Sequence, residues 1–177
     1  MSLLLESNPY VKAVRVSRQF PSTLSIEIVE REPIAMLNID PILMLDRDGI
    51  ILPDQGKSDD FLIPCLSGFN PAKELYPSGQ QTVSVKVQET MGLITRIIDT
   101  YPSLYNNISE VTLNANDEYV IILADYPTKV ILGNNDIWSK IEILGKFENS
   151  LQNKRQLSDY NYLDLRYTNQ VIAKERV

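Results

Sequence analysis

A chain of 177 residues, 44% hydrophobic and 23% charged, can form one folded domain, or one domain and a fragment, and is neither low-complexity nor disordered. Its net charge of -6 repels phosphate backbones, so nucleic acid is excluded as an expected partner. The sequence has no histidine and a single cysteine, Cys65, so it lacks most side chains that serve acid–base catalysis and transition-metal binding. We therefore expect no enzyme, no cofactor and no metal site.

Hydropathy along the sequence indicates how the chain relates to membranes. No stretch approaches the run of about 18 to 20 apolar residues that crosses a bilayer, and the start MSLLLESN lacks the charged front of a signal peptide. We expect this chain to be soluble. Because it opens with Met-Ser-Leu directly before a strand-like segment, we also expect it to be a piece of a longer protein.

Two β-strands joined by a turn are predicted at residues 10–18 and 23–30. The second run, TLSIEIVE, alternates apolar and polar residues as a half-buried strand does. Pro21 lies between the runs and has no N–H to give to a strand ladder. Because an isolated hairpin is marginal in water, residues 1–32 are predicted to be the remainder of one domain, and residues 33–177 to form another.

A second hairpin is predicted over residues 34–52, with its turn at Asp46-Arg47-Asp48-Gly49. Two carboxylates beside a glycine can also indicate calcium. The twelfth position counted from Asp46, where an EF-hand has glutamate, is however Lys57, a cation. We therefore interpret this segment as a turn. A short apolar strand follows at residues 61–68.

An amphipathic helix is predicted from Val83 to Tyr101, because its apolar residues recur at helical spacing and Pro102 terminates the pattern. The residues expected on its buried stripe are Val87, Met91, Ile94, Ile98 and Tyr101.

Three strands and a second helix are predicted after it. The strands, at residues 108–115, 118–125 and 128–133, form an antiparallel meander. The helix runs from a cap at Asn134 or Asn135 through Arg155. One last strand, with one solvent-exposed face, is predicted over residues 160–175. The fold class is therefore α+β: an antiparallel or mixed sheet with two main helices, preceded by a β-hairpin.

Several short motifs in a fixed order resemble those of the FtsQ/DivIB family of bacterial cell-division proteins. No single motif is specific, but the ordered set covers nearly the whole chain. Both tryptophans of the family pattern are replaced here by other aromatic residues. The matching segments are Pro9-Tyr10-Val11, Arg18-Gln19-Phe20-Pro21, Leu24, Glu30-Arg31-Glu32-Pro33-Ile34-Ala35, Leu45-Asp46-Arg47-Asp48-Gly49-Ile50, Leu62-Ile63-Pro64 and Tyr162-Leu163-Asp164-Leu165-Arg166-Tyr167.

The resemblance implies an architecture and a set of partners. Residues 1–32 would be the end of a POTRA domain, and residues 33–177 the β domain that follows it. The full-length protein would be anchored in the inner membrane by a span absent here, with both domains in the periplasm at the division septum. It would be a non-catalytic scaffold that binds divisome proteins of the FtsB and FtsL type and helps to regulate septal cell-wall synthesis.

The docking segment is expected at the C-terminal end, in residues 162–172. As the last strand, it can keep one side unpaired, and an open edge accepts a strand from another chain. In the family the matching strand and the residues after it bind FtsB by strand addition. Asn169-Gln170 departs from the polar residue and glycine common in the family at this point. The candidate partner-binding residues are Tyr162, Asp164, Arg166, Tyr167, Asn169, Gln170 and Ile172.

Other interpretations remain open. Leu163, Leu165 and Tyr167 could simply close the core of the β domain, with Arg166 in solvent. Trp138 is interpreted as a packing residue, since Ile137 and Ile141 lie on the apolar stripe. Two other function classes are an envelope hydrolase that uses a carboxylate pair, and a POTRA-containing subunit of an export or assembly machine.

Overall fold

A computed structural model of the chain describes residue 5 and residues 7–54, 56, 61–151, 154–168 and 170–176. It divides into two compact units, Met1–Phe61 with Pro71–Met91, and Leu62–Asn70 with Gly92–Val177. Helices and a mixed sheet are both present, which confirms the α+β class. None of the helices in the described part of the chain combines the length and the apolar composition that a bilayer crossing requires.

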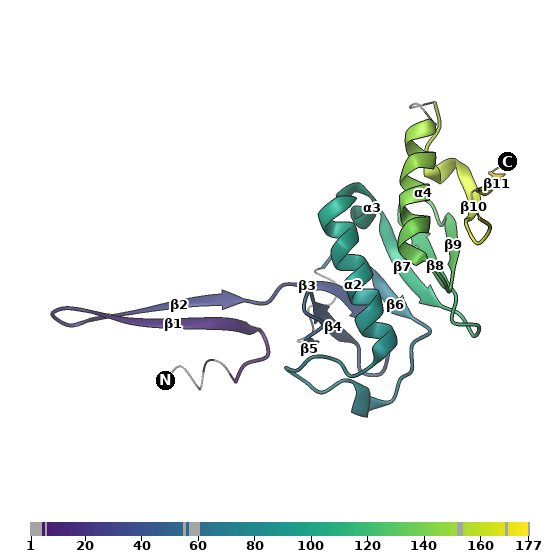
Figure 1. Cartoon of the computed structure of the whole chain (residues 1–177). Helices are drawn as coiled ribbons and strands as arrows, with labels where there is room; N and C mark the ends of the chain where they lie inside the picture. Colours follow the sequence, from purple (N-terminus) through teal and green to yellow (C-terminus); the bar gives the residue numbers. More distant parts are fainter. Residues whose placement is uncertain are drawn as a thin grey trace. The chain divides into compact units, whose positions relative to one another are not determined.

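The first two strands form a two-stranded antiparallel ribbon, drawn in purple in Figure 1. They are β1 (Val11–Gln19) and β2 (Thr23–Glu30), paired so that Val16 lies opposite Ile26. The hairpin predicted at residues 10–30 is therefore confirmed. Period-two alternation and a central proline were sufficient to predict it, because both signals are local.

The first unit also holds three short antiparallel strands in the order β3-β4-β5: Pro33–Leu37, Leu43–Asp46 and Ile51–Pro53. The predicted turn between β4 and β5 is confirmed. The Asp46 carboxylate accepts the backbone N–H groups of Asp48 and Ile50, both at 2.9 Å, and Gly49 has a φ of 71°. The aspartate thus builds the turn by hydrogen-bonding the backbone.

Charged and polar contacts join the ribbon to this small sheet within the first unit. The Arg31 guanidinium donates to the buried Asp46 carboxylate at 2.6 Å, and Lys12 pairs with Asp48 at 3.0 Å. The Tyr10 hydroxyl donates to the backbone oxygen of Pro53 at 2.8 Å. Both predicted turn aspartates therefore also bind cations. Asp48 binds Lys12 of β1, and Asp46 binds Arg31, which directly follows β2.

The strands of the second unit follow the order β11-β10-β9-β8-β7-β6. The predicted meander is confirmed, because β7, β8 and β9 pair antiparallel in succession. Their alternate residues, among them Val111, Ile121 and Val130, are buried. The strands are β6 (Cys65–Ser67), β7 (Ile108–Leu113), β8 (Tyr119–Leu123), β9 (Lys129–Gly133), β10 (Tyr160–Asp164) and β11 (Ile172–Glu175).

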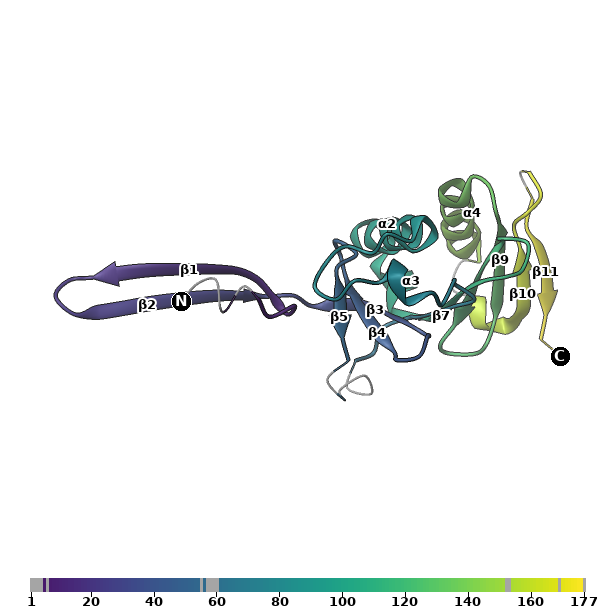
Figure 2. The same cartoon turned by 90° about the horizontal axis from the view of Figure 1, so that it is seen from below.

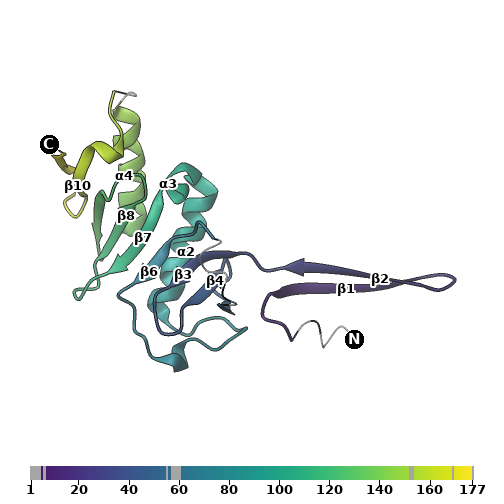
Figure 3. The same cartoon turned by 180° about the vertical axis from the view of Figure 1, so that it is seen from behind.

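Helix α4 (Ile137–Ser150) lies beside β9, on one face of this sheet (Figure 2), while Figure 3 presents the opposite face of β7 and β8. The apolar stripe of α4 buries Ile141 and Leu144. The other helical segments are α2 (Val85–Thr100), α3 (Pro102–Asn106) and the short 3-10 turns η2 (Lys73–Leu75) and η3 (Leu157–Asp159).

Four local predictions are corrected. The strand predicted over residues 61–68 spans only β6, because Pro64 cannot donate to a ladder. Pro102 ends α2 but also begins α3, as proline at a first helical position can. The helix α4 begins after Asp136, not after Asn134 or Asn135, and ends at Ser150, before Arg155. On α2, Ile97 is fully buried and Ile98 only partly.

Gly68 ends β6 where the backbone of β7 approaches closely. A Cβ at this position would lie 2.0 Å from the Leu113 carbonyl oxygen, and its φ of 79° disfavours other residues. We expect Gly68→Ala to lower the free energy of unfolding by about 2–4 kcal/mol, since strain and overpacking combine. Urea denaturation would measure this change.

Gly92→Ala is the matched control, because it makes the same substitution in α2 where a Cβ would meet nothing within 4 Å. Alanine should raise stability there by about 0.5–1 kcal/mol. Equal effects at the two sites would contradict the close approach of β6 and β7.

Candidate functional site

The C-terminal segment predicted as one strand is in fact two strands joined by a turn. Strand β10 pairs parallel with β9, with Leu163 opposite Val130, and antiparallel with β11, with Leu163 opposite Ala173. Tyr162 and Asp164 are therefore paired on both sides, which corrects the expectation that their strand has an open side. Strand β11 is the outermost, and no described strand pairs with its other side.

The position of β10 follows from its side chains and from its connection. Leu163 and the following Leu165 are almost fully buried, and the Leu165 N–H continues the ladder to the Ile131 oxygen at 2.9 Å. At the other end, the buried Thr128 hydroxyl donates to the Tyr160 oxygen at 2.6 Å. A helical crossover, α4, makes the parallel β9–β10 pair possible.

Asp164 and Arg166 form a close ion pair at the end of β10. The Arg166 guanidinium donates to both oxygens of the Asp164 carboxylate, with Nη2 2.7 Å from Oδ2 and Nε 3.0 Å from Oδ1. Asp164 is only 6% exposed. The hydrogen bonds from Arg166 hold the pKa of the Asp164 carboxyl below its usual value, although burial opposes this. Arg166 is therefore exposed, but its guanidinium is bound within the chain.

A buried lysine lies next to this pair. Lys140 of α4 donates from Nζ to the Asn135 Oδ1 at 2.7 Å, and burial lowers the pKa of its ammonium group. Gly133 leaves room for both cations, since a Cβ there would lie 3.1 Å from the Arg166 Cγ and 3.4 Å from the Lys140 Nζ. Asp164, Arg166 and Lys140 thus form a compact polar cluster at the end of β10, where the turn to β11 begins.

The other predicted residues lie in the turn or on the outer strand. Tyr167 and Gln170 are exposed in the β10–β11 connection, and Asn169 lies outside the described residues. Ile172, 41% exposed, is the first residue of β11. Of the predicted set, the structure therefore places only Ile172 on the free edge itself.

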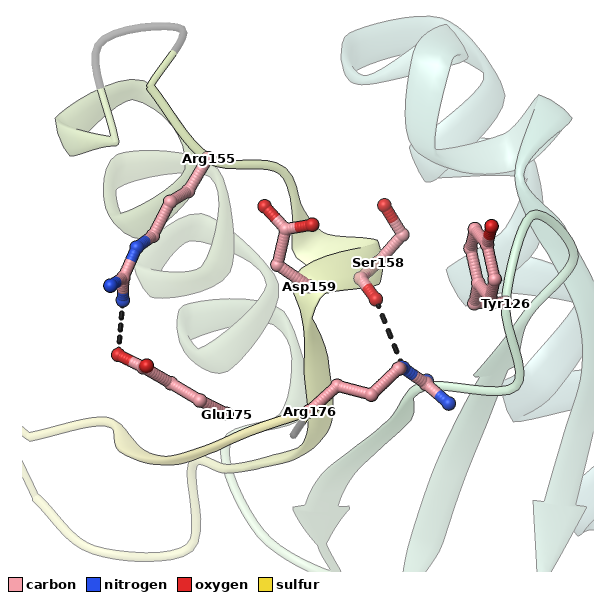
Figure 4. A pocket seen from close by; sticks show the side chains of 6 residues that line it. All are labelled: Tyr126, Arg155, Ser158, Asp159, Glu175 and Arg176. Atoms are coloured by element: carbon pink, nitrogen blue, oxygen red, sulfur yellow. Dashed lines mark hydrogen bonds and ion pairs between the residues drawn. The ribbon is translucent and has the colours of Figure 1, made fainter.

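A pocket of about 460 Å³ lies at the other end of β11 (Figure 4). Arg155 forms an ion pair with Glu175 of β11. Arg176 donates to the backbone oxygens of Ser158 and Tyr160 at 3.3 and 3.2 Å, and its guanidinium lies 5.3 Å from the centre of the Tyr126 ring. These contacts hold the C-terminal end of the edge strand against the segment before β10.

Sequence reasoning missed the residues that make this edge. Ala173, Lys174 and Glu175 were inside the predicted strand but were not named as candidates, and Arg155 was assigned to a helix. The usable signal was the polar run Thr168-Asn169-Gln170, which separates two strand-like runs as a turn does.

Other candidate chemistry has structural explanations in the described residues. The Asp46 carboxylate accepts hydrogen bonds from the backbone of its own turn and from the Arg31 guanidinium. Burial, then the charge of Glu110, raises the pKa of the Cys65 thiol, which disfavours a reactive thiolate. Within the described ranges, no group of three or more Cys, Asp or Glu side chains is placed to hold a metal ion.

Comparison with known proteins identifies similar sequences. The family model described as FtsQ/DivIB, C-terminal related, matches residues 43–174, and the one described as POTRA domain, FtsQ-type, matches residues 3–31. The curated relative "Cell division protein FtsQ" of Geotalea daltonii is 28% identical over 171 residues, which cover 95% of this chain and 60% of that protein. The protein of the same name from Syntrophotalea carbinolica is 26% identical over 174 residues, 98% of this chain and 60% of that protein. The chain thus spans about three-fifths of the length of these relatives.

The ion pair at the end of β10 predicts a pH-dependent stability. Because the pKa of Asp164 is lowered on folding, its contribution is present above the unfolded pKa and is lost as pH falls through the folded pKa. Arg166→Ala should lower the free energy of unfolding by about 1–3 kcal/mol at about pH 7, since a buried carboxylate loses its donors. At acid pH, below the folded pKa of Asp164, the difference from the parent should largely vanish.

Urea titrations at the two pH values would measure both effects. The control is Lys129→Ala, which removes an exposed cation from the neighbouring strand β9. A loss that is as large at low pH as at neutral pH would show that Arg166 acts through packing instead of charge.

Proposed function

Because the chain belongs to the FtsQ/DivIB family of cell-division proteins, we propose that it is a non-catalytic scaffold of the division site that binds a divisome protein through the open edge of β11. The partner is of the FtsB or FtsL type. Binding takes place on the periplasmic side of the inner membrane at the septum and helps to regulate septal cell-wall synthesis. The observation that carries the proposal is the outermost position of β11.

Hydrogen-bond geometry supports an edge that is ready for another strand. The Arg176 N–H donates inward to the Asp159 oxygen at 2.8 Å, and the register has no shift on the β11 side. Backbone groups of a strand alternate in direction, so the N–H groups of Ala173 and Glu175 face the open edge. An incoming strand can accept from both donors without disturbing the β10–β11 ladder.

The side chains around this edge support selective binding. All four residues of β11 are exposed, and Lys174 and Glu175 place both signs of charge on it. Charges on an edge strand hinder indiscriminate pairing, so a partner needs complementary charges. Ile172, the first residue of β11, and Tyr167 in the turn before it are 41% and 48% exposed and supply apolar contact area.

The domain organisation is part of the proposal. Residues 1–32 would be the end of a POTRA domain and residues 33–177 a β domain, in a longer protein with a membrane anchor. The exposed apolar side chains of the ribbon, Val16, Leu24 and Ile28, support this because they suit packing against further parts of a domain. The FtsQ type of the POTRA match favours the scaffold over an export or assembly subunit.

A proline placed on the open side of β11 tests the proposal. Ala173→Pro removes a donor that faces outward but leaves the inward ladder intact, and edge strands tolerate proline. We expect the dissociation constant for an FtsB/FtsL ectodomain complex to rise about tenfold or more, through lost hydrogen bonds and a steric block. Titration calorimetry would measure it.

Ala173→Val is the matched control, since it enlarges the same side chain and keeps the N–H. It should bind like the parent. Circular dichroism and urea midpoints must show that both variants are folded. Deleting residues 162–177 is a poorer test, because it also removes the buried Leu163 and Leu165. A folded Ala173→Pro variant with an unchanged dissociation constant would contradict strand addition at β11.

A further inference from the structure

A groove between α2 and α4, entirely within the second unit, is not used by the proposed edge binding. It has a volume of about 470 Å³, and its lining combines aromatic, apolar and basic side chains. We call it the α2/α4 groove, and the residues that matter here are Arg96, Tyr101, Trp138, Ile141, Gly145 and Lys146.

Gly145 of α4 lies next to the Tyr101 ring at the floor of the α2/α4 groove. A Cβ at Gly145 would lie 3.4 Å from Cε1 of Tyr101, which is an ordinary van der Waals contact, so the ring packs directly against the helix. The Tyr101 hydroxyl hydrogen-bonds to the Glu148 carboxylate, and burial raises the pKa of that hydroxyl.

The wall of the groove is a stacked cation and indole. The Arg96 guanidinium carbon lies 3.7 Å from the centre of the Trp138 ring, and the indole N–H donates to the Glu142 carboxylate at 2.6 Å. This arrangement shows that Trp138 does more than pack beside Ile141. It holds a cation at the mouth of the groove.

The charged side chains of the groove differ in whether they already have a partner. Glu142 and Glu148 each accept a hydrogen bond from an aromatic donor. Arg96 and Lys146 pair with no carboxylate among the described residues. Among the residues that line the groove, Arg96 and Lys146 are cations and Glu142 is a carboxylate, so the lining is positive by one charge on a chain whose net charge is -6. An incoming carboxylate can pair with Arg96 and Lys146, which form no ion pair with the described carboxylates.

From this arrangement we infer that the α2/α4 groove is a second docking site, which takes an acidic peptide segment of a partner protein with one apolar or aromatic side chain between its carboxylates. The apolar side chain contacts Tyr101 and Ile141, and the carboxylates meet Arg96 and Lys146. A glycan is the less favoured occupant, because Arg96 covers a face of the Trp138 ring that a sugar would need for stacking. The site is independent of the β11 edge.

Trp138 makes the test direct, because it is the one tryptophan of the sequence and its fluorescence reports on the groove. The probes are two synthetic peptides, Glu-Asp-Leu-Phe-Glu-Asp and Lys-Arg-Leu-Phe-Lys-Arg. The acidic peptide should shift the emission and bind about tenfold more tightly by calorimetry, with a preference that falls as salt is added. The double variant Arg96→Glu, Lys146→Glu should lose that preference or reverse it.

The matched control is Lys73→Glu, which reverses an exposed cation of η2 outside the groove. It should keep the preference for the acidic peptide, as should Ala173→Pro, which alters only the β11 edge. The inference is wrong if both peptides bind equally, if Lys73→Glu has the same effect as the double variant, or if soluble peptidoglycan fragments shift Trp138 and displace the acidic peptide.

Discussion

The pairing of β10 with a strand on each side determines where this sheet ends. Its parallel register with β9 places Leu163 and Leu165 in the core, so β10 cannot leave the sheet without exposing them. Its antiparallel register with β11 then leaves β11 with one bonded side and one open side. A buried strand therefore supports an exposed one. The docking surface proposed for this protein depends on that support, because an edge can be recognised only if it is already ordered.

Charged contacts keep the edge strand in place at both ends. Asp164 and Arg166 close one end of the hairpin, while Arg155 and Arg176 hold the other. The exposed pair of Arg155 and Glu175 is of a weak kind, worth about 0–1 kcal/mol, so its effect is to order the strand more than to stabilise the fold. The Asp164–Arg166 pair differs, because its carboxylate is buried. Order before binding matters because a strand that is already extended loses less conformational entropy when a partner adds to it. The α2/α4 groove uses charge differently, since its cations are left for a ligand.

The accuracy of sequence-based prediction differs between elements for physical reasons. The ribbon, the Asp46 turn and the β7–β9 meander were predictable because side-chain alternation and turn chemistry are local properties. The segment from Tyr160 to Glu175 was predicted as one strand, since its turn has neither proline nor glycine and strand-like residues continue on both sides. The β10–β11 hairpin is recognised only when the neighbouring strands are in place. The same holds for the pairing of Arg166 with Glu118 and for the stacking of Arg96 on Trp138, because these partners are distant in sequence.

By itself, the sequence determined the α+β class, most strands and both main helices, and through its ordered motifs the FtsQ/DivIB family. It also located the C-terminal segment as the region of interest. Only the tertiary structure decided that β11, and not β10, forms the edge, and that Trp138 and Arg96 line a groove. The reason is that strand order and side-chain stacking depend on contacts between residues far apart in the chain. Periodicity reports which face of an element is buried, but it contains no information about which neighbour covers that face.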